Sequence, residues 1–453
     1  EEYRNDPLQF GLHSDYSKAI SDHLTVSGGW NAIYHRTRNY RQVVDLMGAD
    51  FWVDVDQFAE QDFEDPNASQ NDLNNTNRLI GVGDAFGYNY DMVVMKGEAY
   101  GQAFFSYPKW DAYAGLNLSQ TSFYRKGNYQ NGRFPDNSFG KGETHNFFNY
   151  GVKGGFVYKI SGRQYATING AYMTRAPFSR NVYIAPRVQD RVVENMQNVQ
   201  ILSGDVNYIM RYTNFELRAT GYYSQINNDV WNRTFYHDLE RTFVNYTMTD
   251  VDQTFMGVEL GVRGKVATVI ELSGAFAMGE FFYSNRPTAT ITADNNSELL
   301  ASNRTLYLEN FRIGGSPQTI ASAGVRYNSP KFWFIGVNFN YFADIYLAPN
   351  PDRRTVESTE GYVTQDPQWS EVLDQSKLDN GFTLDAFAGY SYRIKYGKYI
   401  RVNASVTNIL NDQDLRVWGF EQLRFDPSEP GRFPNMFRYM YGTTFFLMAT
   451  FIF

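Results

Sequence analysis

Hydrophobic and polar residues alternate one by one along much of this chain. In the segment YIRVNASVTN, the even positions from 400 to 406 are apolar and the odd positions from 401 to 407 are polar. The segments TLDAFAGYSYR and FELRATGYYS show the same alternation. A period of two is the pattern of a β-strand whose two faces meet different surroundings. The pattern therefore predicts strands with one apolar face and one polar face.

About fifteen segments carry this pattern. Many of them exceed ten residues, whereas strands of soluble proteins typically have about five or six. A strand that crosses a bilayer at a tilt needs about nine to eleven residues. The predicted strands lie roughly at 7–16, 22–36, 97–108, 109–124, 143–160, 163–175, 203–213, 215–230, 253–265, 267–284, 317–329, 331–345, 382–396, 399–413 and 439–453.

The connections between these segments alternate between short and long. The short ones lie near 107–110, 161–163, 212–215, 265–268, 328–331 and 395–398, and Tyr, Trp or Phe flank nearly all of them. The long ones lie near 37–96, 125–142, 176–202, 231–252, 285–316, 346–381 and 414–438. Tight turns at one rim, long extracellular loops at the other and aromatic girdles are typical of outer-membrane barrels.

The composition is compatible with a barrel that crosses the membrane by strands. The mean hydropathy of the 453 residues is −0.47, and no apolar run approaches the eighteen or more residues of a membrane-spanning helix. A net charge of −8 without clusters of Lys and Arg argues against nucleic acid as a partner. We therefore expect an all-β, transmembrane, antiparallel β-barrel over residues 1–453, located in a bacterial outer membrane.

The number of strands bears on how such a barrel closes. Backbone groups in lipid must all be paired, so the sheet must close on itself. Bacterial single-chain barrels have an even number of strands, and fifteen is odd. The chain opens on Glu1 without a signal peptide. We therefore expect the N-terminal part of the barrel to lie upstream of Glu1.

Catalytic and metal-binding patterns are weak. The five histidines are scattered without metal-ligand spacing, and no nucleotide-binding glycine loop or catalytic triad stands out, so we expect no enzyme activity, cofactor or metal. Residues 42–77 contain nine acids and no Lys or Arg. They could offer oxygens to calcium, but a solvated acidic loop is the favoured interpretation. Trp52, Trp231 and Trp369 are candidate ligand-binding residues by their position in long loops.

Several segments together resemble a known family. They are RVNASVTNILND (401–412), GFEQLRFD (419–426), FPNMFRYMYGTTFFL (433–447), MTRAPFSRNVYIAPR (173–187), SGDVNYIMRY (203–212), NGRFPDNSFGK (131–141), FYHD (235–238) and SPKFWF (329–334). The set resembles TonB-dependent outer-membrane receptors of the Bacteroidetes type, the group that usually carries an N-terminal carboxypeptidase-regulatory-like domain. The similarity extends over essentially the whole chain.

The resemblance implies a barrel of 22 strands around a plug domain. The first strand here would be the eighth, with seven strands, the plug and the energy-coupling box upstream. It also implies active import driven by a TonB–ExbB–ExbD complex, in contact with outer-membrane lipids and lipopolysaccharide. A surface lipoprotein is a further candidate partner. Family ligands include iron chelates, cobalamin, glycans and peptides, and nothing in the sequence selects one. A passive porin-like channel and a surface adhesin or structural barrel remain alternatives.

The C-terminal segment YMYGTTFFLMATFIF is predicted to be the closing strand. Tyr439, Tyr441, Phe445, Leu447, Ala449, Phe451 and Phe453 would share the lipid face. The opposite face is also rather apolar, which suggests packing against a plug or neighbouring side chains. A terminal Phe with apolar residues at alternate positions resembles the signal read by the barrel assembly machinery. We assign that assembly signal to Phe445, Leu447, Phe451 and Phe453.

Overall fold

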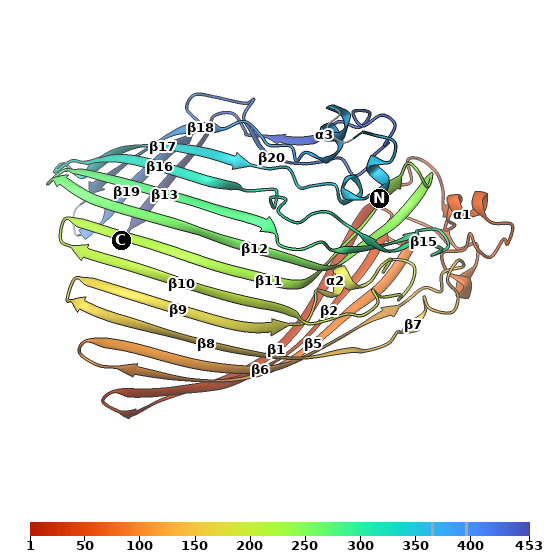
Figure 1. Ribbon diagram of the computed structural model, residues 1–453, viewed down its shortest axis with the longest axis horizontal. Coiled ribbons are helices and arrows are strands. Elements are labelled where there is room, and N and C mark those ends of the chain that lie inside the picture. The colour runs from red at the N-terminus through yellow and green to blue at the C-terminus, as the bar shows by residue number, and fades with distance from the viewer. Residues whose placement is uncertain (364–366, 395–396) are drawn as a thin grey trace.

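A computed structural model describes residues 1–363, 367–394 and 397–453 (Figure 1). Within these ranges, fifteen long strands form one antiparallel sheet, and each overlaps one of the segments predicted from alternation. The all-β, antiparallel fold is therefore confirmed. The strands are β1 (Glu2–Ser21), β2 (Leu24–Gln42), β5 (Ala85–Ser106), β6 (Trp110–Gly127), β8 (His145–Ser161), β9 (Gln164–Arg175), β10 (Val199–Tyr212), β11 (Phe215–His237), β12 (Thr242–Ala267), β13 (Ile270–Tyr283), β16 (Pro317–Asn328), β17 (Trp333–Ile345), β18 (Gly381–Arg393), β19 (Tyr399–Thr407) and β22 (Thr444–Ile452).

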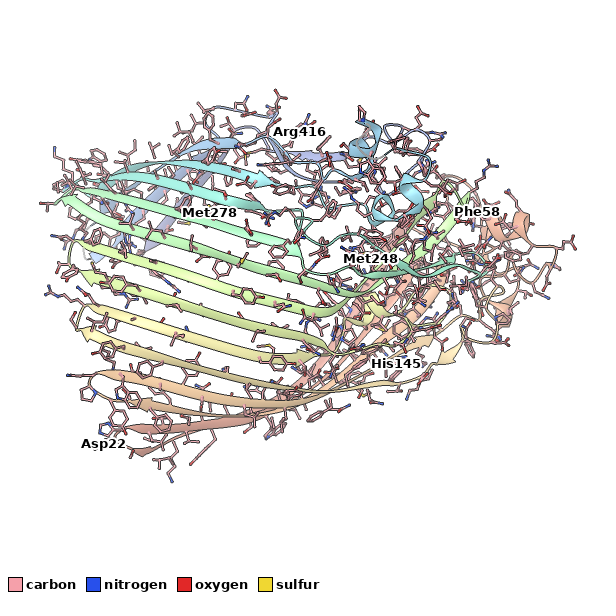
Figure 2. All side chains as sticks on the ribbon, in the orientation of Figure 1. Asp22, Phe58, His145, Met248, Met278 and Arg416 are labelled. Atoms are coloured by element: carbon pink, nitrogen blue, oxygen red, sulfur yellow. The ribbon has the colours of Figure 1, made fainter. Side chains whose placement is uncertain are left out.

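Successive long strands pair with one another, so the sheet runs through the chain in sequence order. Tight turns gather at one end of the sheet, on the left of Figure 1, and the long connections gather at the other. Figure 2 shows the two ends by their side chains, with Asp22 at the turn end and Phe58, Met248 and His145 at the loop end. The predicted separation of short and long connections is thus present in the fold.

The two edge strands of the sheet remain unpaired on one side. Among the described residues, β1 pairs only with β2, and β22 pairs only with β19. The curved sheet is therefore open along one seam. The described residues therefore form an open sheet, and not by themselves the closed barrel of 22 strands that the family resemblance implies for the complete protein.

The two faces of the sheet differ as the alternation predicts. In β8, Phe148, Tyr150 and Val152 are exposed, whereas Asn149 between them is 2% exposed. Cross-strand pairing also aligns the apolar positions, because Ala404 lies opposite Leu447 at the last pair of strands. The outer face is thus an apolar band that many strands assemble together.

Aromatic rings cluster at the turn end. Tyr107 stacks on Trp110 and on His23, with ring centroids 4.4 Å apart in both pairs. Tyr327 lies 5.2 Å from Trp333 across another turn. This is the placement of an interfacial girdle, since Tyr and Trp prefer the boundary between hydrocarbon and water. The turn expected at 395–398 lies partly outside the described residues.

At the loop end, several strands extend beyond their predicted limits. β5 begins at Ala85, inside the expected loop 37–96. β11 and β12 continue as a hairpin through most of the expected loop 231–252, and β14 (Thr288–Ala293) pairs with β12 inside the expected loop 285–316. The alternating pattern misses these extensions because it depends on the contrast between an apolar face and a polar face. Beyond that contrast both faces pack against protein, as in β12, where residues 244–248 are all buried.

The C-terminal strand is shorter than predicted. β22 covers only Thr444–Ile452, while Tyr439 belongs to β21 (Met436–Tyr439), which pairs with β20 (Arg416–Phe420). Asn408 redirects the chain here, because its Nδ2 donates to the carbonyl oxygen of Tyr441 over 2.9 Å. We had expected Tyr439 and Tyr441 to share a strand face with Phe445. That expectation is wrong, because neither residue belongs to β22.

The buried core lies at the loop end of the molecule. The largest cluster of buried side chains joins the ends of β11 and β12 to β14 and includes Tyr246, Met248 and Ile291. No described helix is long and apolar enough to span a membrane. The short elements are β3 (Trp52–Val53), β4 (Leu79–Ile80), β7 (Gly140–Lys141), β15 (Leu299–Thr305), α1 (Gln57–Asp62), α2 (Ser179–Val182), α3 (Pro367–Leu373), η1 (Leu73–Asn75), η2 (Pro351–Arg354) and η3 (Glu357–Thr359).

Candidate functional site

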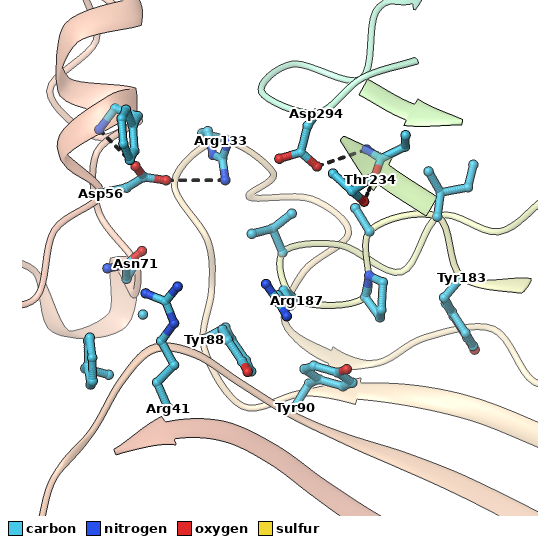
Figure 3. A pocket seen from close by; sticks show the side chains of 18 of the residues that line it. Arg41, Asp56, Asn71, Tyr88, Tyr90, Arg133, Tyr183, Arg187, Thr234 and Asp294 are labelled. Atoms are coloured by element: carbon cyan, nitrogen blue, oxygen red, sulfur yellow. Dashed lines mark hydrogen bonds and ion pairs between the residues drawn. The ribbon is translucent and has the colours of Figure 1, made fainter. Parts of the chain in front are cut away.

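A cavity of about 780 Å³ lies among the loops at the loop end (Figure 3). Its walls come from loop 43–84, the start of β5, segment 176–198 and the projecting ends of β11 and β12. Figure 3 shows Arg41, Arg187, Tyr88 and Tyr90 along one side, with Asp294 and Thr234 opposite. The cavity thus gathers residues from parts of the sequence far apart.

Tyr183 anchors one wall. Its ring is 1% exposed and packs with Phe123 and Phe147, and its hydroxyl accepts a hydrogen bond from the backbone N–H of Arg125 over 2.9 Å. Burial raises the pKa of the Tyr183 phenol to about 12. The residues that follow Tyr183, up to Val188, line the cavity. Its anchoring therefore determines where that wall stands.

Loop 43–84 forms the facing wall and is ordered by its acids. Asp54 is 3% exposed, pairs with Arg78, and accepts hydrogen bonds from Asn71 Nδ2 at 2.8 Å and from the N–H of Gly87 at 2.9 Å. Asp56 caps α1 by accepting from two of its backbone N–H groups. Asp54 and Asp56 therefore hold the loop in place through hydrogen bonds and ion pairs. For these two acids, the interpretation of residues 42–77 as a solvated acidic loop is wrong.

Metal binding gains no support from these acids. Within the described ranges, no group of three or more His, Cys, Asp or Glu side chains could hold a metal ion. The carboxylate of Asp54 is instead engaged by an arginine, an amide and a backbone N–H. The calcium alternative for residues 42–77 therefore has no coordinating cluster in the described structure.

Positive charge predominates in the cavity. Its lining contains the five arginines Arg41, Arg133, Arg180, Arg187 and Arg233, against the three carboxylates of Glu1, Asp56 and Asp294. Arg41 pairs with Glu1 at 3.7 Å, and Arg133 pairs with Asp56 at 3.3 Å. The other three arginines form no ion pair with any described residue. Asp294 accepts a hydrogen bond from Asn245 Nδ2 at 2.9 Å.

The structure separates the three tryptophans predicted as ligand-binding candidates. Trp52 lines the cavity. Trp231 packs beside the core cluster, with its ring 6.4 Å from that of Tyr246, and Trp369 lies half-buried in α3. Trp231 and Trp369 are not among the residues that line this cavity. The arginines were missed, although Arg180 and Arg187 both occur in the segment MTRAPFSRNVYIAPR that carried part of the family resemblance.

No protein-family model and no curated protein match the chain by sequence. Solved structures match its fold. The copper transporter OprC aligns with a TM-score of 0.60 and 13% identity, over 99% of this chain and 56% of that chain. The ferric citrate transporter FecA aligns with a TM-score of 0.58 and 10% identity, over 99% of this chain and 55% of that chain. The ferric yersiniabactin uptake receptor FyuA from Yersinia pestis aligns with a TM-score of 0.57 and 11% identity, over 100% of this chain and 55% of that chain.

This chain spans about half the length of the structures it matches. They are transporters and receptors, not enzymes, and they share with this chain the antiparallel sheet. Identities of 10–13% support a statement about fold alone. The chain therefore has the fold of about half of each of these transporter and receptor chains.

Proposed function

We propose that this chain forms part of the barrel of an outer-membrane importer. The importer captures a ligand at the loop end and passes it inward with energy supplied through TonB. The observation that carries the proposal is the fold shared with metal and siderophore receptors. The ordered cavity at the loop end supports it, because a capture site needs side chains held in place before the ligand arrives.

A polar inner surface below the cavity supports passage of a hydrophilic ligand. A second cavity, of about 530 Å³, is lined by Lys96, Glu98, Asn117 and Lys153. Glu98 accepts hydrogen bonds from Lys96 at 2.5 Å and from Asn117 at 3.2 Å. Charged groups of this kind need water or partners, so the lumen is wet or filled by a polar domain.

The open seam between β1 and β22 bears on the complete architecture. Unpaired backbone groups along both edges would be costly in lipid. We therefore propose that further strands close the barrel, giving the 22 strands implied by the family resemblance, with a plug inside. The assignment to the Bacteroidetes type, with a lipoprotein partner at the surface, rests on the same resemblance.

Conductance and TonB binding together test the transport proposal. We expect the full-length protein in planar lipid bilayers to show no steady open-channel conductance, because a plug would fill the lumen. We also expect it to retain the purified periplasmic domain of TonB in a pull-down assay. A steady conductance without TonB retention would instead establish the passive channel. Neither conductance nor retention would favour the adhesin or structural barrel.

The C-terminal residue offers a test of the proposed assembly signal. Phe453 is 91% exposed, with its ring 5.6 Å from that of Phe451. We expect deletion of Phe453 to lower the amount of folded, heat-modifiable protein in the outer membrane. Phe453→Trp is the matched control, because it keeps a terminal aromatic ring and should assemble normally. Equal assembly of the deletion variant and the unaltered protein would contradict the role in recognition by the barrel assembly machinery.

A further inference from the structure

Three of the arginines that line the cavity have no carboxylate partner among the described residues. Arg180 and Arg187 come from segment 176–198, and Arg233 comes from the end of β11 that projects beyond the sheet. The guanidinium of Arg233 donates to the backbone carbonyl of Asn232 over 2.9 Å. Guanidinium groups bind carboxylates and phosphates through paired hydrogen bonds. Their capacity to bind an anion is thus not used by any described carboxylate.

Hydrogen bonds hold the two segments that carry these arginines together. Asn181 Nδ2 donates to the carbonyl oxygen of Val230 over 2.9 Å. Asn232 Nδ2 donates to the carbonyl oxygens of Tyr183 and Ile184 over 2.9 and 3.1 Å. These hydrogen bonds fix the two backbone segments that carry the arginines relative to each other. Less conformational entropy is therefore lost when a ligand binds.

This arrangement places like charges near one another. Arg233 faces the cavity, yet burial, and after it the positive charge of Arg180, lower its pKa. An anion bound beside Arg180 and Arg233 would relieve this repulsion. The site is thus poised for negative charge.

We propose that this cavity binds a small ligand that carries at least two anionic oxygen groups, carboxylate or phosphate. The inference deepens the proposed import function, because it names the chemical class of the captured ligand. Arg180, Arg187 and Arg233 bind the anionic groups, and Tyr88 and Tyr90 line the side from which Arg41 and Arg187 project. Asp294 is the carboxylate that opposes anion binding, since it lines the same cavity without an ion pair to a described residue.

The test measures binding of citrate and of pyrophosphate to the full-length protein in nanodiscs by calorimetry, with glycerol as the neutral comparison. We expect at least one of the two anions to bind and glycerol not to bind. Arg180→Gln, Arg187→Gln and Arg233→Gln should each weaken the affinity about tenfold, the loss expected for one charged hydrogen-bond partner. Raising the salt concentration should weaken it further.

Two further variants separate a binding role from a folding defect. Arg286→Gln removes an exposed loop arginine that pairs with Glu309 at 3.0 Å outside the cavity, and it should leave the affinity unchanged. Asp294→Asn should strengthen anion binding, because it removes opposing charge while its side-chain oxygen can still accept from Asn245. A gain of affinity cannot arise from misfolding.

The two probes, citrate and pyrophosphate, also distinguish between two classes of anionic ligand. Preference for citrate assigns a polycarboxylate, and preference for pyrophosphate assigns a polyphosphate. Binding of neither anion, or binding that the arginine substitutions leave unchanged, would overturn the inference. Anion binding by a protein that retains no TonB and conducts ions steadily would overturn the import proposal alone.

Discussion

Replacing Arg354 with methionine should loosen the packed loops and lower the free energy of their local opening by about 3–5 kcal/mol. Arg354, at the end of η2, is 0% exposed and forms a two-pronged ion pair with Glu421, in which Nη2 donates to Oε1 over 2.8 Å. Glu421 is 2% exposed and also accepts from the N–H of Asn350. Methionine would leave the Glu421 carboxylate buried without its positive partner, which is the costly case for a buried pair.

Amide hydrogen exchange of residues 346–363 and 416–426 would measure the effect. The double variant Arg354→Met with Glu421→Leu should recover most of the lost protection, because it removes both buried charges. Arg286→Met is the matched control, and loss of its exposed pair should cost less than about 1 kcal/mol. Unchanged protection in Arg354→Met would mean that the ion pair does not join these two loops.

The long strands of the sheet could be predicted because one physical contrast acts at every second residue. One face of each strand is apolar and exposed and the other is polar, so β8 alternates between exposed Phe148 and buried Asn149. The contrast ends where the strands leave the sheet's apolar band. Residues 244–248 of β12 are strand with both faces buried against protein, and the period-two pattern gives no signal for them.

The cavity could not be predicted from position along the chain. Its walls come from six or more separate segments, and a tryptophan in a long loop can equally pack into the loop core, as Trp231 does. The distinguishing property of Arg180, Arg187 and Arg233 is the lack of a carboxylate partner among described residues. That property depends on which acidic side chains the folded loops place beside each arginine. It therefore cannot be read from the sequence alone.

Residues in the family-like segments often serve the packing of the loops. Glu421 in GFEQLRFD pairs with buried Arg354, and Asp238 in FYHD pairs with Arg424 at 2.6 Å. Gly132 in NGRFPDNSFGK approaches the carbonyl oxygen of Asn67 so closely that an added Cβ would lie 1.8 Å from it. These residues of the family-like segments therefore stabilise the packed loop end.

Tyr183→Ala should collapse the arginine wall of the cavity and cost about 3–5 kcal/mol of local stability, the range for removing a large buried aromatic ring. The ring of Tyr183 packs with Phe123 at 6.2 Å between centroids, and its hydroxyl accepts from the Arg125 N–H. Its removal frees the segment that carries Arg187. We therefore expect hydrogen exchange of residues 180–188 to rise and citrate or pyrophosphate affinity to fall together.

Tyr183→Phe separates packing from the hydroxyl. It keeps the ring but leaves the buried N–H of Arg125 without this acceptor, so it should cost about 1–3 kcal/mol, less than Tyr183→Ala. It also removes a pH dependence, because the folded state raises the pKa of the phenol to about 12. The neutral phenol stabilises the wall fully below the ordinary tyrosine pKa of about 10, and that stability is lost as the pH rises from about 10 to about 12. Near-ultraviolet circular dichroism should therefore show less alkaline loss of loop structure in Tyr183→Phe than in the unaltered protein. Identical alkaline transitions would show that the Tyr183 hydroxyl does not govern this wall.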